Sequence, residues 1–232
     1  MMQPKPKNAR RWLATAAMAG VASYIVIDVV LQFLPPHYSV LHDAESNLAV
    51  GPFGWIMNLN FLGRGVTTLC AIAAINRVGH ASGLRRGGVF LLAVGGVCSA
   101  ILAFFPTDVV PGSGLVAVTT AGTVHLFVAG LGFLAALAGI LLLTGWMRTV
   151  RELQGTYRAA LTLAVITALG LVLLGLSAIL GSAFLGLAER VCLLGVLGWV
   201  LVVSNAIRRF SRRSALIPPV GMANSEHVPP TA

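Results

Sequence analysis

Long apolar runs alternate with short polar segments along the whole chain. Six runs are each long enough to cross the hydrocarbon core of a bilayer, which takes about 20 residues of α-helix. They cover residues 12–34, 53–75, 88–105, 118–146, 159–184 and 187–206. The pattern predicts an all-α fold, a polytopic transmembrane bundle of six helices. This transmembrane domain, 12–206, follows a basic N-terminal segment, 1–11, and precedes a basic tail, 207–232, that we expect to be disordered.

Composition indicates the same class of protein. Hydrophobic residues make up 57% of the chain and charged residues only 10%, whereas a soluble domain carries about 25% charged residues. The mean hydropathy is +0.88. A chain of this kind cannot cover a surface in water, so the lipid bilayer is its first expected partner. The first run follows a basic leader but is longer than the apolar core of a signal peptide, and we expect an uncleaved anchor.

The net charge of +9 is explained by topology. All but two of the 16 Lys and Arg residues lie in the N-terminal segment, the loops after the second and fourth runs, and the tail. With six spans these segments share one side of the membrane, and cytoplasmic loops are the basic ones. The sequence therefore predicts a multi-pass protein of the inner (cytoplasmic) membrane with both termini in the cytoplasm. It gives no reason to expect nucleic-acid binding.

Polar side chains within the spans gather toward the predicted outer end. Tyr24, Asp28 and Gln32 are spaced i, i+4, i+8 and form one stripe on the first helix. Asn60 and Arg64 share a face of the second helix in the same way. Facing inward, these groups would avoid the cost of a charge in lipid, about 2.5–3.5 kcal/mol at the bilayer centre. We therefore predict an outward-opening cavity that receives them.

Two further spans contribute to this predicted cavity. His125 lies in line with small residues of the fourth span, which let another helix approach closely, so we expect it to face protein. Glu189 and Arg190 begin the sixth span. The candidate polar cluster is Asp28, Ser46, Asn58, Asn60, Arg64, Asp108, His125, Glu189 and Arg190.

A structural interpretation of the same residues stays open. Asp28 with Arg64 and Glu189 with Arg190 would form charge-balanced pairs that set helix register, although polar contacts between membrane helices average only about 0.6 kcal/mol. The segment HDAES, 42–46, is typical of a solvated loop cap, and Asp108 of a turn or a cavity rim. An ionisable residue inside a membrane is equally a sign of function.

Four segments carry a resemblance to a known family. They are SNLAVGPFGWIMNLNFLGRG, AFFPTDVVPGSG, GTVHLFVAGLGFLAALAG and GLAERVCLLGVLGWVLVVSNAIRR. In this order, over about 12–209, the chain resembles the prokaryotic domain-of-unknown-function family 998 (DUF998). The resemblance implies a six-helix inner-membrane protein and no particular activity. Its motif positions fall on Ser46, Asn58, Asp108, His125, Glu189 and Arg190, whereas Asp28 and Arg64 lie outside the pattern.

The function that these observations favour is binding or movement of a small molecule, a lipid or a proton at the outer cavity. One alternative is a membrane hydrolase with Ser46, His125 and Asp108, with or without a metal. The chain lacks the three ligands typical of catalytic zinc and the nucleophile-elbow motif, so no metal site is predicted and a non-enzymatic role is favoured. Another alternative is an accessory subunit whose small-residue stripes bind a partner or a second copy. No cofactor motif is found.

Overall fold

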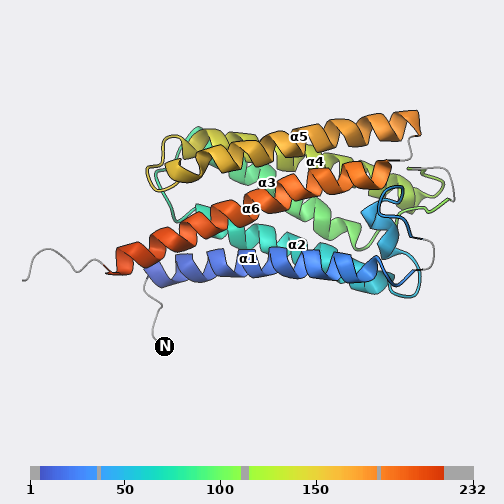
Figure 1. Ribbon diagram of the computed structural model, residues 1–232, viewed down its shortest axis with the longest axis horizontal. Coiled ribbons are helices and arrows are strands. Elements are labelled where there is room, and N and C mark those ends of the chain that lie inside the picture. Colours follow the sequence, from blue (N-terminus) through green and yellow to red (C-terminus); the bar gives the residue numbers. More distant parts are fainter. Residues whose placement is uncertain (1–5, 36–37, 111–114, 182–183, 217–232) are drawn as a thin grey trace, which may run out of the picture.

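The computed structural model describes residues 6–35, 38–110, 115–181 and 184–216 and contains six long helices (Figure 1). They are α1 (Pro6–Leu31), α2 (Gly54–Ile75), α3 (Gly83–Leu102), α4 (Thr120–Met147), α5 (Tyr157–Leu180) and α6 (Leu185–Leu216). Two short 3-10 helices, η1 (Glu45–Ala49) and η2 (Gln154–Thr156), lie in the connections. Each long helix contains a stretch long and apolar enough to cross a membrane, which confirms the predicted six-helix class.

Helix boundaries follow local capping chemistry more closely than the apolar runs. The side chains of Ser82 and Thr119 accept backbone N–H bonds at the starts of α3 and α4. Gly181, with φ of 60°, ends α5 in a left-handed conformation before the predicted boundary at 184. Helix α6 continues to Leu216, so the part of the predicted tail nearest the membrane is helical, and 217–232 lie outside the described residues.

Helices that follow one another in the chain lie side by side, and α6 returns to pack against α1. The six helices therefore form a closed ring. Its least extensive contact between successive helices is the one between α4 and α5, which we call the α4–α5 seam. The start of α1 and the end of α6 lie at one end of the bundle, and η1 lies at the other (Figure 1). We call the latter the η1 end; it is the end that the basic loops predict to be outer.

Small residues allow the tight helix pairs on either side of the seam. A Cβ at Gly139 of α4 would lie 2.8 Å from the backbone nitrogen of Leu92 in α3. A Cβ at Gly170 of α5 would lie 2.3 Å from the backbone nitrogen of Cys192 in α6. These glycines of the α4 and α5 stripes are thus used for packing within the bundle, as expected where helices approach closely in membranes.

The segment between α1 and α2 folds over the η1 end of the bundle. A Cβ at Gly186 would lie 2.3 Å from the carbonyl oxygen of Asp43, so this segment rests directly on the first turn of α6. Four residues of η1, including Glu45 and Ser46, are buried as a result. A segment that the sequence places in a loop therefore contributes side chains to the interior.

Candidate functional site

A cavity of about 200 Å³ lies inside the η1 end of the bundle. Its polar lining comes from η1, α2, α4 and α6, and its α5 wall is apolar. The polar side chains are Glu45, Ser46, Arg64, His125 and Glu189, and the α5 residues are Leu171, Leu174, Gly175 and Ala178. Four of the predicted candidates, from four separate elements, therefore meet around one space.

The cavity reaches the surface of the bundle at the α4–α5 seam. Gly130 of α4 and Gly175 and Ala178 of α5 line the cavity and are also exposed. A Cβ added at Gly130 or Gly175 would meet no atom within 4 Å, which marks open space there. The glycines at the seam thus face open space, whereas Gly139 and Gly170 lie directly against the backbone of α3 and α6.

Three carboxyl groups, Asp28, Glu45 and Glu189, form what we call the acidic cluster beside this cavity. The backbone N–H of Glu45 donates to Glu189 Oε2 at 2.6 Å. The Glu45 carboxyl also interacts with the carboxyl of Asp28 and the hydroxyl of Tyr24. Asp28 accepts one bond at Oδ2, from Gln32 Nε2 at 2.7 Å, while Oδ1 is buried without a partner. The cluster therefore combines like charges with an unsatisfied acceptor.

The ionisation of Glu45 is strongly disfavoured. Its side chain is only 2% exposed, and burial raises the pKa of Glu45 well above the ordinary value of 4.5. The charges of Asp28 and Glu189 raise the pKa further, and the opposing effect of Arg64 is smaller. Glu45 is therefore the member of the acidic cluster that we expect to hold a proton at neutral pH.

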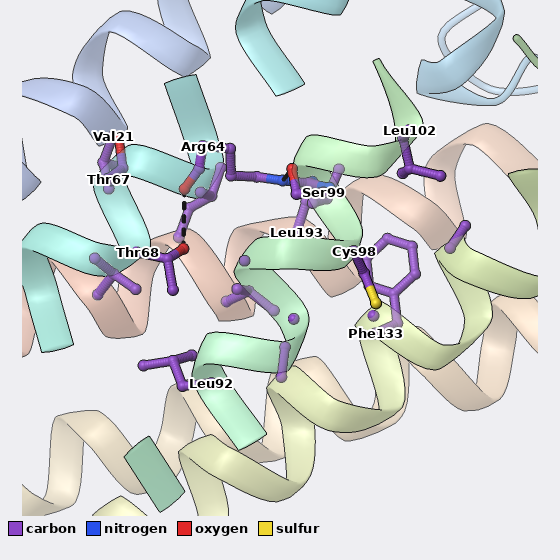
Figure 2. A pocket seen from close by; sticks show the side chains of 18 of the residues that line it. Val21, Arg64, Thr67, Thr68, Leu92, Cys98, Ser99, Leu102, Phe133 and Leu193 are labelled. Atoms are coloured by element: carbon purple, nitrogen blue, oxygen red, sulfur yellow. Dashed lines mark hydrogen bonds between the residues drawn. The ribbon is translucent and has the colours of Figure 1, made fainter. Parts of the chain in front are cut away.

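Arg64 binds to neutral groups instead of the Asp28 carboxylate that the sequence offered as a partner. Its Nε donates to Ser99 Oγ at 2.7 Å and its Nη1 donates to the hydroxyl of Tyr24 at 3.3 Å. The guanidinium also lies 5.3 Å from the centroid of the Tyr24 ring, within cation–π range. Figure 2 shows the side chain of Arg64 extending toward Ser99. The structure thus gives no support to an Asp28–Arg64 pair.

Arg64 also lines a smaller cavity deeper in the bundle, whose lining side chains are drawn in Figure 2. The deeper cavity, of about 50 Å³, is lined by residues of α1, α2, α3, α4 and α6. Arg64, Leu102, Ala129 and Phe133 line both cavities. Of these four shared lining residues, Arg64 is the one with a charged side chain.

Arg190 anchors the segment between α1 and α2 to α6. Its Nη1 donates to the carbonyl oxygens of Val40 and Asp43, each at 3.2 Å, and to that of Gly186 at 3.1 Å. Its Nη2 donates to the hydroxyl of Tyr38. Consecutive helical residues point in different directions, so Arg190 makes these contacts while Glu189 faces the amide of Glu45. Glu189 and Arg190 are therefore held by these contacts and not by the predicted pairing with each other.

Asp108 ties the end of α3 to the start of α4. Its Oδ2 accepts the backbone N–H groups of Val118 and Thr119, each at 2.7 Å, and its Oδ1 accepts the Thr119 hydroxyl at 2.8 Å. These bonds, with the Thr119 backbone donor contributing most, hold the pKa of Asp108 below its usual range. The carboxylate serves this connection and does not line the cavity.

His125 is 1% exposed and faces protein, as the small-residue stripe predicted. Its Nδ1 lies 2.6 Å from the carbonyl oxygen of Phe105. A carbonyl only accepts, so Nδ1 carries the proton and Nε2 of the neutral ring is an acceptor. In a Ser–His–Asp triad the acid accepts from this nitrogen. Because the Phe105 carbonyl accepts from Nδ1, the predicted alternative of a Ser46–His125–Asp108 triad is not assembled.

The two asparagines of α2 lie outside the cavity lining. Asn60 is buried and its Nδ2 donates to the backbone oxygen of Tyr24 at 3.1 Å, which links α2 to α1. Asn58 has a buried Oδ1 without a partner. Among the described residues, no group of three His, Cys, Asp or Glu side chains is placed to hold a metal ion.

Glu45, Tyr24 and Ser99 are the contributors that the sequence did not assign to the cluster. Glu45 lies in HDAES, where the composition favoured a solvated loop, and only the packing of this segment on α6 buries it. Tyr24 was visible through its i, i+4 spacing from Asp28. Ser99 is a lone serine in an apolar run, and nothing near it in sequence indicates its bond to Arg64.

Comparison with known proteins adds a family but no activity. A family model described as "Protein of unknown function (DUF998)" matches residues 18–206, which include every candidate residue and both cavities. No curated protein and no solved structure matches the chain. The function must therefore be argued from the cavity and the residues that line it.

Proposed function

The chain belongs to the DUF998 family, and we propose that this multi-pass membrane protein binds a lipid-like amphiphile in the cavity at the η1 end. The observation that carries the proposal is the separation of polar and apolar lining. Polar side chains approach from η1, α2, α4 and α6, while the α5 wall offers only apolar groups. Ligand sites commonly combine an apolar lining with a few convergent polar groups.

The size of the cavity suits part of an amphiphile. Its volume of about 200 Å³ is larger than the roughly 150 Å³ of an engineered apolar cavity that stays dry and binds benzene. It is smaller than the roughly 300–1,000 Å³ of sites that enclose whole drug-sized ligands. We therefore expect the cavity to take a polar head and the first part of a chain, with the rest of the chain outside.

The α4–α5 seam offers a way out for that chain. Gly130, Gly175 and Ala178 line the cavity and are exposed at the surface of a helix pair that packs sparsely. Around them the seam presents apolar side chains such as Leu134 and Leu176 to the surroundings. A tail that leaves between these helices enters the hydrocarbon core of the bilayer.

The acidic cluster supports the proposal because the protein alone does not satisfy it. Buried polar groups without partners cost roughly 1–3 kcal/mol each in proteins. Asp28 Oδ1 has no partner, and Glu45 is buried between two other carboxyl groups. Ionisable groups kept inside a membrane at such a cost usually mark a binding or transport site.

The experiment is to look for a bound amphiphile and to close the seam. Gly175→Phe places a large side chain in the open mouth of the cavity. Gly63→Phe is the matched control, since Gly63 is also an exposed helical glycine with open space around it but does not line the cavity. Native mass spectrometry and lipid extraction would be applied to each protein purified in mild detergent.

We expect an amphiphile to accompany the wild type and Gly63→Phe, and to be lost, at least tenfold, from Gly175→Phe. A wild type that carries nothing and takes up nothing from added lipid would overturn the proposal. So would equal binding by the two variants, because the bound molecule would then lie on the outer surface of the bundle.

A further inference from the structure

We infer that the polar end of the cavity selects amphiphiles whose head donates hydrogen bonds, a hydroxyl or a protonated amine, over amphiphiles with an anionic head. The inference rests on the proposed function, because it names the class of molecule that the same cavity takes. It follows from the balance of donors and acceptors around the cavity and from the local sign of charge.

Acceptors predominate among the polar groups that line the cavity. Glu189 contributes carboxylate oxygens from α6, and the protonated Glu45 contributes from η1 a carboxyl group that both accepts and donates. Glu189 accepts the Glu45 amide at Oε2, and a carboxylate has room for about four donors, so it keeps capacity for more. His125 presents Nε2 as an acceptor, because Nδ1 donates to the Phe105 carbonyl. Ser46 adds a hydroxyl that accepts or donates.

The two cationic side chains near the cavity already donate to acceptors of the protein itself. Arg64 is the one cationic residue among the described residues that line the cavity. Its Nε donates to Ser99 at 2.7 Å, its Nη1 donates to Tyr24, and its guanidinium lies against the Tyr24 ring. Arg190, the other cation near the acidic cluster, is held by four acceptors of the segment at 38–43 and the first turn of α6.

The local charge works in the same direction. An anionic head in the cavity would lie beside the carboxylate of Glu189, with the carboxyl of Asp28 next to the protonated Glu45. Like charges brought together at a recognition site cost several kcal/mol and exclude wrong partners. A hydroxyl or ammonium head instead supplies donors to these carboxyl groups and to His125. It thus relieves the crowding that the protein leaves unsatisfied.

The net charge of the protein would by itself favour the opposite class of amphiphile. The chain carries a net charge of +9, and its described basic residues other than Arg64 and Arg190 lie toward the opposite end of the bundle from the acidic cluster. Attraction to the whole molecule would therefore favour anionic amphiphiles. Selection by the cavity predicts higher affinity for the amine and the alcohol than for the anions. General charge attraction would give the opposite order, so the two explanations are distinguishable.

The test compares four amphiphiles with the same twelve-carbon chain: dodecylamine, 1-dodecanol, dodecanoate and dodecyl phosphate. Each would be titrated into the delipidated protein in a neutral detergent near neutral pH, with the shift in melting temperature as the readout. Gly175→Phe and Gly63→Phe would be measured in parallel. The Glu189→Gln variant keeps an acceptor at α6 and removes its negative charge.

We expect dodecylamine and 1-dodecanol to raise the melting temperature of the wild type and of Gly63→Phe, with apparent affinities at least about tenfold above those of the two anions. Glu189→Gln should weaken the amine and leave the alcohol nearly unchanged. Anions that bind as well as or better than the amine and alcohol, with binding lost in Gly175→Phe, would overturn the inference and leave the proposed function standing. No binding of any amphiphile, or binding that Gly175→Phe does not reduce, would overturn both.

Discussion

Two acidic groups near the η1 end illustrate how differently the same chemistry is used. Asp108, between α3 and α4, accepts three hydrogen bonds from Val118 and Thr119. Glu45, in η1, is buried beside Asp28 and Glu189. The first carboxylate stabilises a connection, and the second is held among groups that repel its charge. A position at the η1 end does not by itself distinguish a structural carboxyl group from a functional one. The hydrogen-bond partners of each carboxyl group do.

The pKa shifts of the two acids are opposite in direction and follow from these surroundings. Donors from Thr119 and Val118 lower the pKa of Asp108, whereas burial and neighbouring carboxyl groups raise the pKa of Glu45. Folding therefore favours the charged form of Asp108 and the neutral form of Glu45. Three substitutions test this contrast.

The largest effect is expected at Arg190, which holds the Glu45 segment in place. Arg190→Gln removes donors to the carbonyls of Val40 and Asp43 and to Tyr38, and a hydrogen bond to a charged group contributes about 1.5–3 kcal/mol net of its exchange with water. We expect a loss of about 3 kcal/mol in unfolding free energy, measured by denaturation in mixed micelles. Limited proteolysis should then cut within residues 38–44.

Arg190→Lys is the control for this substitution. Lysine keeps the charge but lacks the planar set of five donors, so it should recover only part of the lost stability. If Arg190→Gln unfolds like the wild type, the segment is held by its apolar contacts. The acidic cluster would then not depend on this anchor.

The next effect is the pH dependence that Glu45 imposes. A carboxyl whose pKa is raised in the folded state binds more protons than in the unfolded state, so stability falls as pH rises from the ordinary value of 4.5 through the raised pKa. Within that window the loss is about 1.4 kcal/mol per pH unit. Glu45→Gln cannot ionise, so it should melt higher than the wild type at neutral pH and equally near pH 4.

The groups that face Glu45 set the control for this measurement. They are Tyr24 and Asp28 of α1, Arg64 of α2 and Glu189 of α6. Asp28→Asn removes one of the like charges, so it should reduce the pH dependence without abolishing it. A Glu45→Gln variant that melts below the wild type at neutral pH would show that the ionised carboxylate stabilises the fold, and the contrast with Asp108 would fail.

The sequence predicted the fold well because the membrane imposes a pattern that one chain can reveal. The six apolar spans and an inward-facing His125 need only the length of a span and the cost of exposing polar groups to lipid. It also collected Ser46, Arg64, His125 and Glu189, which line one cavity.

The sequence could not predict which of these groups contact one another, because the contacts depend on how the helices and the loops between them pack. The sequence offered Asp28 as a charge partner for Arg64, but the bundle directs the Arg64 side chain toward Ser99 of α3. Glu45 is in a segment without periodicity, and its burial arises from contacts with α6. Partner choice within a bundle is decided by such tertiary contacts, which carry no local signal.

The smallest effect is expected at Asp108, and it should have the opposite sign of pH dependence. A carboxyl whose folded pKa is lowered stabilises the protein above its ordinary value of 3.8, and this contribution is lost as pH falls through the lowered pKa. Asp108→Asn should therefore melt below the wild type at neutral pH and approach it in acid. The difference should be modest, because the carboxylate lies near the surface and solvent screens it.

A companion variant identifies which donors matter. Thr119→Val removes the hydroxyl that donates to Asp108 Oδ1 but leaves the backbone N–H groups of Val118 and Thr119 at 2.7 Å from Oδ2. Since the backbone donor of Thr119 lowers the pKa most, the acid-sensitive part of the melting curve should largely survive. A constant loss of about 1 kcal/mol from the missing cap of α4 should appear at every pH. If the pH dependence disappears with the hydroxyl, the side chain rather than the backbone satisfies Asp108, and its contrast with Glu45 would depend on one threonine.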